Sequence, residues 1–260
     1  MNAMTTSRSA LETSPMALGP AQIIATVRAD AARAGLDLVA PFPVGLYNRA
    51  VDAAWQLPTL GSDSHLGLII GNTRALWPRF LDALRAEPAR LDEPHPLDRY
   101  VAETVTAVLS DLPVRVEHRL ADEPPPRRVA MQRLADLAGL AWLSPSHLCI
   151  HPVFGPWIAL RAAVVVEMES PPGPPPSSQP TCADCATRCL PPFERAIAAV
   201  GDPIEAHSQV STHWRRWLAS RDTCPIGREH RYDDDQIEYH YTKNRAILRR
   251  LVESPSRELR

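Results

Sequence analysis

One short segment, Leu148 to Arg161, gathers a thiol, an imidazole and two aromatic rings around a turn. Its sequence, LCIHPVFGPWIALR, places Cys149 and His151 at the end of a predicted strand, and two prolines and a glycine then build the turn. Backbone amides, an imidazole and aromatic rings around one concavity suit a large planar ligand. An ordinary β-hairpin with a hydrogen-bonded histidine explains the same pattern. As a metal ligand, His151 lacks a second histidine at ligand spacing.

Four further cysteines form a second candidate site. Cys182, Cys185 and Cys189 lie in the sequence CADCATRC, and Cys224 precedes a proline. Four thiols, two of them at C-x2-C spacing, can close a tetrahedral metal site. The C-x2-C-x3-C spacing differs from the bacterial ferredoxin run, although the Cys-Pro step matches its remote ligand. Zinc, one iron–sulfur cluster, and free or redox-active thiols therefore all stay open.

Arginine carries almost all of the basic charge, since Lys243 is the only lysine among 28 basic residues. Guanidinium groups bind carboxylates and phosphates bidentately, so an arginine-rich site suits an anionic ligand. A codon bias that also enriches alanine and proline explains the same skew. Because 30 acidic residues balance the basic ones to a net charge of −2, we expect neither a nucleic-acid partner nor a polybasic membrane anchor.

The elements that must position these groups alternate between helix and strand up to residue 168. Apolar periodicity predicts helices at 20–34, 73–87, 97–110 and 127–140, and strands at 65–71, 114–120, 147–150 and 157–168. Pro78 implies a kink or a later start in the second helix. Three arginine-rich helices are predicted at 191–200, 203–220 and 233–252, the last capped by acidic residues. This order indicates an α+β or α/β layer fold with a mainly helical C-terminal part.

Composition divides the chain into four segments. We expect a disordered N-terminus (1–19), an α+β core (20–169), a stiff proline-rich connector (170–181) and a cysteine-containing helical segment (182–260). The uncharged stretch 137–160 is long enough to span a bilayer, but its three prolines and two histidines argue for a buried core. Without an apolar secretory signal, a cytoplasmic protein with reduced thiols is expected.

Five blocks of the chain, in this order and spacing, resemble the cobalamin-processing family typified by the methylmalonic aciduria and homocystinuria type C protein. The most specific block is the turn HPVFGPWIALR. The full set is GLDLVAPFPVGLYNRAV (35–51), LGLIIGNTRALWPRFLDAL (66–84), residues 128–142, the turn itself (151–161), and RDTCPIGREHRYDDDQIEYHYTKNR (221–245).

The resemblance implies a flavin-nitroreductase-like α+β fold, with a mixed sheet, flanking helices and a helical C-terminal part. It also implies binding of cobalamin with the nucleotide base detached from cobalt. The family removes the upper axial ligand, using reduced FMN or FAD for cyanide and glutathione or another small thiol for alkyl groups. A flavin reductase is an implied partner. Stripping axial donors makes Co(III) easier to reduce, and a dry pocket protects the product.

The resemblance also assigns residues to two surfaces. The thiol substrate is assigned to Arg161, Arg221 and Arg245, because guanidinium forks match the two carboxylates of glutathione. The chain departs from the family at Asp136, which replaces a histidine. The cobalamin surface is assigned to His118, Val129, Ala130, Met131, Gln132, Leu143, Ser144, Cys149, His151 and Leu160.

We therefore expect a cytoplasmic enzyme that binds cobalamin and reductively removes its upper axial ligand. Two alternatives stay open. The first is a non-enzymatic cobalamin carrier whose cysteines hold a structural zinc. The second is a corrinoid reductase fed by one iron–sulfur cluster, similar to the epoxyqueuosine reductases and reductive dehalogenases, which join a related cobalamin domain to such clusters.

Overall fold

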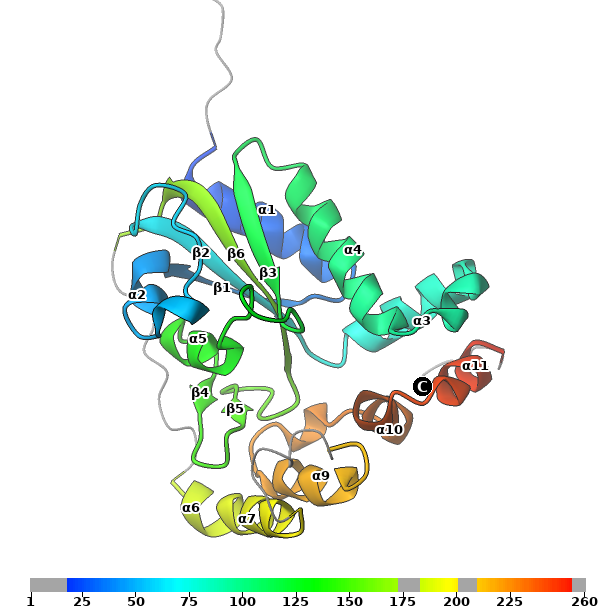
Figure 1. The fold of residues 1–260 in the computed structure, drawn as a ribbon. Coiled ribbons are helices and arrows are strands. Elements are labelled where there is room, and N and C mark those ends of the chain that lie inside the picture. The colour runs from blue at the N-terminus through cyan, green and yellow to red at the C-terminus, as the bar shows by residue number, and fades with distance from the viewer. Residues whose placement is uncertain (1–17, 173–182, 201–209, 254–260) are drawn as a thin grey trace, which may run out of the picture.

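A four-stranded sheet forms the centre of the computed structural model, which describes residues 18–172, 183–200 and 210–253 (Figure 1). The strand order is β1-β2-β6-β3. The predicted strands at 65–71, 114–120 and 157–168 are confirmed within two residues at each end. The strands are β1 (Leu38–Pro43), β2 (His65–Asn72), β3 (Val116–Leu120) and β6 (Ala159–Glu169).

All three strand pairings are antiparallel, whereas the resemblance implied a mixed sheet. The helical connection between β2 and β3 makes these two strands run in the same direction. They form no parallel pair because β6 lies between them and pairs with both. The α+β class itself is confirmed.

Helices cover both faces of the sheet because β6 is apolar on both of its faces. Ala162, Val164 and Val166 face one core, and Ala163 and Val165 face the other. The first core contains side chains of α1 (Pro20–Arg33), α3 (Leu76–Ala86) and α4 (Pro96–Ser110), and the second those of α2 (Val44–Asn48) and α5 (Met131–Leu137). The described residues also contain three short 3-10 helices: η1 (Ala53–Trp55), η2 (Pro88–Asp92) and η3 (Arg228–His230).

Prolines explain where α3 begins and why the strand β1 was not predicted. Helix α3 begins at Leu76, so Pro78 lies in its first turn, where the absent N–H has no helical partner to lose. The later start is therefore the correct one of the two alternatives. No strand is predicted at 38–43, because Pro41 and Pro43 lie there. The strand forms because β1 is at the edge of the sheet and pairs only with β2.

The C-terminal part is helical, as predicted. The helix expected at 233–252 is interrupted at Lys243, whose φ of 54° ends one helix before the next begins. Asp233 caps the first of these, accepting a hydrogen bond from the Gln236 N–H at 2.6 Å. The helices are α6 (Cys185–Arg188), α7 (Leu190–Ala198), α9 (Trp214–Thr223), α10 (Asp234–Thr242) and α11 (Arg245–Glu253).

Several predicted segments lie partly or wholly outside the described residues: the N-terminus 1–17, most of the proline-rich connector, and 203–209 of one predicted helix. Among the helices that the structure describes, none is long and apolar enough to cross a membrane. The uncharged stretch 137–160 instead forms two short strands and the turn between them and β6.

Candidate functional site

A short hairpin separates the two candidate sites of the sequence. Strand β4 (Trp142–Leu143) pairs antiparallel with β5 (Cys149–Ile150), with Leu143 opposite Cys149. Because side chains alternate along a strand, Cys149 and Ile150 point to opposite faces. Cys149 belongs to the core beneath α5, whereas Ile150 packs against the cysteines of the C-terminal part.

His151 shapes the turn that follows β5. Its Nδ1 accepts hydrogen bonds from the backbone N–H groups of Val153 at 3.1 Å and Phe154 at 3.2 Å. The backbones of His151 and Gly155 exchange two further hydrogen bonds of 2.9 Å. Burial lowers the pKa of His151 to about 4, so the imidazole is neutral and Nε2 carries its proton. This geometry is that of the hydrogen-bonded turn histidine considered from the sequence.

Two glycines allow the turn to dock onto the C-terminal part. Gly155 and Gly227 both have left-handed φ values, 57° and 68°. A Cβ on Gly155 would lie 1.9 Å from the carbonyl oxygen of Ile226, and one on Gly227 would lie 2.3 Å from the carbonyl carbon of Phe154. The chain therefore crosses itself backbone against backbone, which fixes residues 221–228 beside the turn.

A cleft of about 310 Å³ opens where α5, β5, the turn and the C-terminal helices meet. Leu148, Pro156, Ile158 and Tyr241 form part of its walls. The structure also brings together in this cleft five of the residues predicted from the sequence: Met131, Gln132, Cys149, Leu160 and Arg221.

The polar groups on the α5 side of this cleft are uncharged and hydrogen-bonded. The Gln132 side chain donates from Nε2 to the His147 carbonyl at 2.5 Å. The Cys149 thiol donates to the Gln132 carbonyl at 3.7 Å. Burial raises the pKa of Cys149 to about 12, so the side chain is a neutral thiol and a poor nucleophile.

A β-bulge in β6 sends two consecutive predicted residues to different places. The register with β2 shifts so that Ile70 lies opposite Ala162 while Gly71 lies opposite Leu160. Leu160 consequently packs against the core beneath α5 and lines the cleft. Arg161 instead donates from Nε to Asn72 Oδ1 at 2.6 Å. Arg161 is therefore not among the described residues that line the cleft.

Arg161 and Arg221 lie around one buried tyrosine. The Arg161 side chain is 12% exposed, and its buried Nη2 has no hydrogen-bond partner among the described residues. Arg221 donates from Nη2 to the Pro156 carbonyl at 2.7 Å, and its guanidinium lies 4.5 Å above the Trp157 ring and 5.4 Å from the Tyr232 ring. Both guanidinium charges act on Tyr232, whose pKa burial raises to about 12. The structure therefore brings two of the three predicted arginines together.

The third predicted arginine, Arg245, is anchored elsewhere. It donates from Nη1 to the carbonyl oxygens of Asp92 at 2.8 Å and Glu93 at 3.1 Å. Lys243 shares an acidic neighbour with Arg161: its Nζ is 3.9 Å from the Asp98 carboxylate, and Arg161 Nη1 is 4.0 Å from it. Lys243 was not predicted as a site residue, although its being the only lysine was a signal in the sequence.

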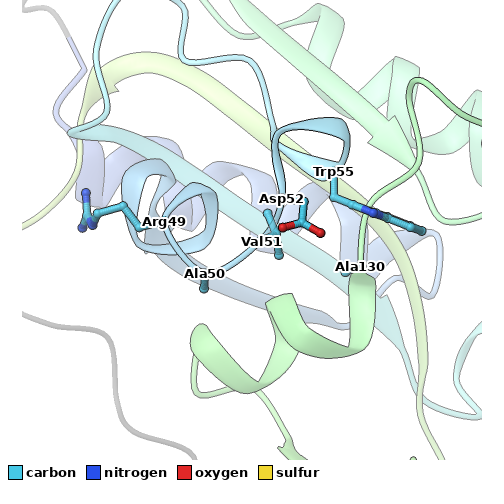
Figure 2. A pocket seen from close by; sticks show the side chains of 6 residues that line it. All are labelled: Arg49, Ala50, Val51, Asp52, Trp55 and Ala130. Atoms are coloured by element: carbon cyan, nitrogen blue, oxygen red, sulfur yellow. The ribbon is translucent and has the colours of Figure 1, made fainter.

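Two residues of the predicted cobalamin surface, Val129 and Ala130, directly precede α5. Val129 is buried in the core beneath α5, and Ala130 donates its N–H to Tyr47 Oη at 2.9 Å. Ala130 also lines the second cleft, of about 460 Å³. Figure 2 shows Asp52 and Trp55 near Ala130 in this cleft, with the Arg49 side chain pointing away from them. The start of α5 thus separates two clefts.

The hairpin residues Leu143 and Ser144 support the cleft from behind. The Leu143 N–H donates to Asp136 Oδ1 at 3.1 Å, so the residue that replaces the family's histidine holds the hairpin. The Ser144 N–H donates to the Leu148 carbonyl at 2.9 Å, and its buried hydroxyl contacts that of Ser146 at 3.0 Å.

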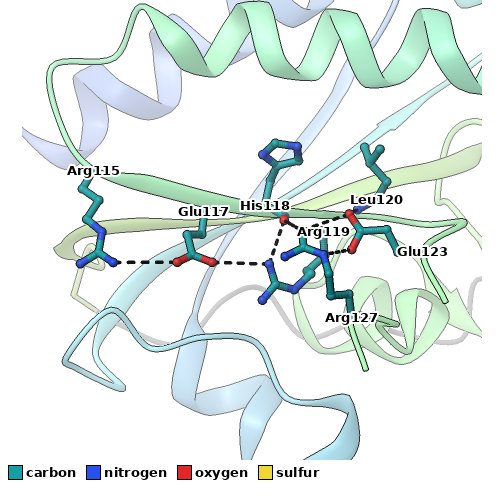
Figure 3. Close-up of polar contacts among 7 residues, drawn as sticks. All are labelled: Arg115, Glu117, His118, Arg119, Leu120, Glu123 and Arg127. Atoms are coloured by element: carbon teal, nitrogen blue, oxygen red, sulfur yellow. Dashed lines mark hydrogen bonds and ion pairs between the residues drawn. The ribbon is translucent and has the colours of Figure 1, made fainter. Parts of the chain in front are cut away.

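His118 lies apart from the other predicted residues. It is opposite Val164 on β6, a residue of the core beneath α4, and its ring points toward α4 (Figure 3). Burial lowers its pKa. Its carbonyl accepts hydrogen bonds from Arg119 at 3.1 Å and Arg127 at 2.9 Å, so its backbone helps to hold the loop that leads to α5.

Three of the four cysteines predicted as a metal site form a buried group on the far side of the hairpin. Cys185, Cys189 and Cys224 are at most 3% exposed and pack with Ile150. The Cys189 thiol is hydrogen-bonded with the thiols of Cys185 and Cys224. Burial, chiefly, raises the pKa of Cys189 to about 12.

The metal itself is not decided by this geometry. Cys182 lies outside the described residues. Within residues 18–172, 183–200 and 210–253, no three ligating side chains are arranged as a metal site. The sequence prediction of zinc, an iron–sulfur cluster or free thiols therefore stays a prediction.

The antiparallel sheet with helices on both faces is an α+β arrangement, and the likeness to solved structures identifies it as a nitroreductase-like fold. A B12-trafficking protein CblC of C. elegans has this fold, with a TM-score of 0.66 over 90% of this chain and 97% of that one, at 18% identity. An epoxyqueuosine reductase solved with a tRNA stem loop aligns with a TM-score of 0.51 at 12% identity, covering 83% of this chain and 68% of that one.

The relatives found by comparing sequences all carry one name. The chain is 27% identical over 251 residues to the cyanocobalamin reductase/alkylcobalamin dealkylase of Bos taurus, covering 85% of this chain and 81% of the bovine protein. The human protein of the same name is 27% identical over 222 residues (78% and 72%), and that of Danio rerio 26% over 252 residues (88% and 92%). No family model matches. These relatives confirm the resemblance found in the sequence.

Proposed function

We propose that this protein binds cobalamin and removes its upper axial ligand, as the names of its relatives describe for those proteins. The observation that carries the proposal is the composition of the 310 Å³ cleft. Residues from three distant blocks of the sequence meet there: Met131 and Gln132, Cys149 and Leu160, and Arg221. The resemblance assigns each of these residues to the cobalamin surface or to the thiol surface.

The lining of the cleft, with apolar side chains beside polar ones, suits the apolar face and the polar edge of a corrin ring. Apolar side chains exclude water, which otherwise competes for a vacated cobalt coordination position. The Gln132 amide offers hydrogen bonds to the amide-rich edge of the corrin ring. The neutral Cys149 thiol adds contact surface without adding a nucleophile. The second cleft, across the start of α5, gives room for parts of cobalamin that the first cannot hold.

Two reactions follow from the proposal. With cyanocobalamin, a reduced flavin gives one electron to Co(III), and cyanide leaves with its electron pair to yield cob(II)alamin. With an alkylcobalamin, the thiolate sulfur attacks the cobalt-bound carbon. The carbon–sulfur bond forms as the cobalt–carbon bond breaks, and its electron pair stays on cobalt as Co(I).

The thiol of this second reaction is proposed to bind at Arg161 and Arg221. Among the described residues, the buried Nη2 of Arg161 has no hydrogen-bond acceptor. This supports the assignment, because such a guanidinium nitrogen is stabilised by an incoming carboxylate. Glutathione, or another small thiol with carboxylates, has the matching charge.

The proposal has three further parts, which rest on the sequence. FMN or FAD is the reductant, and a flavin reductase supplies it. The protein acts in the cytoplasm, where thiols stay reduced. The cysteines form a candidate site for zinc or one iron–sulfur cluster, with free or redox-active thiols as the alternative, and their spacing and the contacts of Cys189 with Cys185 and Cys224 support the candidate. Metal and sulfide analysis of anaerobically purified protein and of a Cys189→Ser variant tests this last part.

The direct experiment mixes purified protein with each cobalamin under anaerobic conditions and follows the absorbance spectrum. We expect a base-off shift on binding, cob(II)alamin with cyanocobalamin and reduced flavin, and thiol-dependent loss of the methyl group from methylcobalamin. Tight binding without turnover in either reaction would identify a carrier. No base-off shift at all would contradict the proposal.

A further inference from the structure

Three buried cysteines lie behind the β4–β5 hairpin, and the contacts of their thiols are pairwise. The Cys189 thiol is hydrogen-bonded with the thiol of Cys185 and with that of Cys224. Among the described residues, no three ligating side chains are arranged to hold a metal ion. Two thiols in contact can instead join as a disulfide, and two pairs in this group are in contact.

The first pair, Cys185 and Cys189, is held apart by the helix that contains it. Cys185 begins α6, and the Cys189 N–H donates to the Cys185 carbonyl at 3.1 Å, one helical turn later. Side chains four residues apart on a helix have Cβ atoms about 5–6 Å apart. A disulfide needs Cβ atoms about 3.5–4.5 Å apart, so this pair forms one only if the turn unwinds.

The second pair, Cys189 and Cys224, belongs to two different elements. Cys189 lies between α6 and α7, and Cys224 directly follows α9 with an extended backbone (φ −62°, ψ 126°). No single helix holds both cysteines, so no helical turn fixes their separation. Helices α7 and α9 lie side by side (Figure 1), with the rings of Phe193 and Trp217 6.0 Å apart. A small shift of α9 against α7 therefore brings the two sulfur atoms together.

We propose that Cys189 and Cys224 are a redox-active pair, which the disulfide form of a small thiol oxidises to a reversible disulfide. The inference goes beyond the proposed function, because it requires neither cobalamin nor flavin. It also selects redox-active thiols among the alternatives that the sequence leaves open for these cysteines.

Oxidation of the pair proceeds by two thiol–disulfide exchanges. The Cys189 thiolate attacks one sulfur of the small disulfide, a mixed disulfide forms at Cys189, and one small thiol leaves. The Cys224 thiolate then attacks the Cys189 sulfur, the Cys189–Cys224 bond forms, and the second small thiol leaves. The two cysteines lose two electrons and two protons, and the small disulfide gains both.

Access to the buried pair comes through α6. Cys189 is 1% exposed and Cys224 is 0% exposed, so the closed structure shields both sulfur atoms. Helix α6 is a single turn whose residues 186–188 are exposed, and a single helical turn opens easily. Because this opening uncovers Cys189 first, Cys189 is the attacking thiol and Cys224 the one that completes the disulfide.

The disulfide fastens a part of the chain that lines the cobalamin cleft. Arg221 lines the cleft and lies one helical turn before Cys224. Leu148 lines the cleft and also packs against the cysteines. A cross-link between α9 and the α6–α7 junction restricts the unfolded chain. We therefore expect the oxidised protein to have a Tm about 5–10 °C above that of the reduced protein.

Peptide mapping identifies the pair without any variant. Reduced wild-type protein, whose metal content is measured first, is incubated anaerobically with glutathione disulfide, alkylated and digested with trypsin. Cleavage after Arg188 separates Cys189, in the peptide 189–195, from the cysteines before it, and Cys224 falls in the peptide 222–228. We expect these two peptides to be linked, two of the five thiols to be lost, and both to return with excess glutathione.

Serine variants assign the two roles. Cys224→Ser should keep glutathione on the peptide 189–195 as a trapped mixed disulfide, because no second thiol is placed to displace it. Cys189→Ser should lose no further thiol on oxidation and should show no rise in Tm. Cys182→Ser and Cys185→Ser are the matched controls, and both should form the linked peptides as wild type does.

Four results would overturn the inference. The first is a disulfide between Cys182 and Cys185, the C-x2-C pair. The second is a full set of free thiols at every ratio of glutathione disulfide to glutathione. The third is a bound zinc or iron–sulfur cluster that is lost in both Cys189→Ser and Cys224→Ser, because these thiolates would then be metal ligands. The fourth, a linked pair without a rise in Tm, contradicts the fastening beside the cleft.

Discussion

His151 has the side chain of a metal ligand or an acid–base catalyst, but here it hydrogen-bonds the backbone of its own turn. Its Nδ1 accepts two N–H groups of the turn, and burial lowers its pKa from 6.5 to about 4. Below pH 6.5 the unfolded chain takes up a proton that the folded protein refuses until about pH 4. The free energy of unfolding therefore falls as the pH falls through this window.

Replacing His151 tests this linkage. Asn supplies a side-chain acceptor near the position of Nδ1 and does not titrate, so His151→Asn should lose less stability than wild type between pH 7 and pH 5. Urea unfolding at the two pH values measures the difference. His118 and His240, whose pKa values burial also lowers, leave part of the pH dependence in the variant. Equal pH dependence in both proteins would contradict the assignment.

The fold brings some of the residues that the resemblance assigns to the cobalamin surface together and leaves others apart. Met131, Gln132 and Cys149, which the resemblance assigns to the cobalamin surface, all line the cleft. His118, assigned to the same surface, lies apart from them, because the direction of its side chain depends on the register of β3 with β6. Tyr241 and Lys243 were not predicted, because their nearness to Arg221 and Arg161 comes from distant segments folding together.

The turn between β5 and β6 positions the site by docking on the segment around Gly227. Of the elements, this turn was the most specific in the sequence, yet its partner segment was not evident, because contacts between backbones leave no side-chain pattern. The bulge in β6 and the edge strand β1 were missed for a related reason: both are set by pairing between strands.

The docking predicts a large effect of one methyl group. Gly155→Ala places a Cβ 1.9 Å from the Ile226 carbonyl oxygen, so either the turn or its partner must move. We expect a loss of about 2–4 kcal/mol in the free energy of unfolding, from overpacking and backbone strain together. Chemical denaturation measures it.

Gly61→Ala is the matched control for this change. Gly61 also has a positive φ, 105°, but a Cβ there meets nothing within 4 Å. Its loss should be about 1–2 kcal/mol, from backbone strain alone. A Gly155→Ala variant no less stable than Gly61→Ala would show that the turn and the C-terminal part are not held by this crossing.

At the scale of the whole molecule, the C-terminal part contributes both to the 310 Å³ cleft and to the buried group of Cys185, Cys189 and Cys224. Cobalamin that binds only the folded protein should stabilise all of it, because the cleft joins the sheet side to the C-terminal helices. At a cobalamin concentration of about 100 times Kd, the expected gain is about 2.7 kcal/mol, seen as a rise in Tm. A Tm independent of cobalamin concentration would contradict binding in this cleft.

The most direct test of cobalamin processing in the cleft is anaerobic decyanation by reduced flavin in wild type and two tryptophan variants. Leu160→Trp fills the 310 Å³ cleft, whereas Val153→Trp changes an exposed residue of the adjoining turn. We predict the cob(II)alamin spectrum with wild type and Val153→Trp and its loss with a folded Leu160→Trp. No cob(II)alamin with wild type, or full activity in Leu160→Trp, would contradict the account.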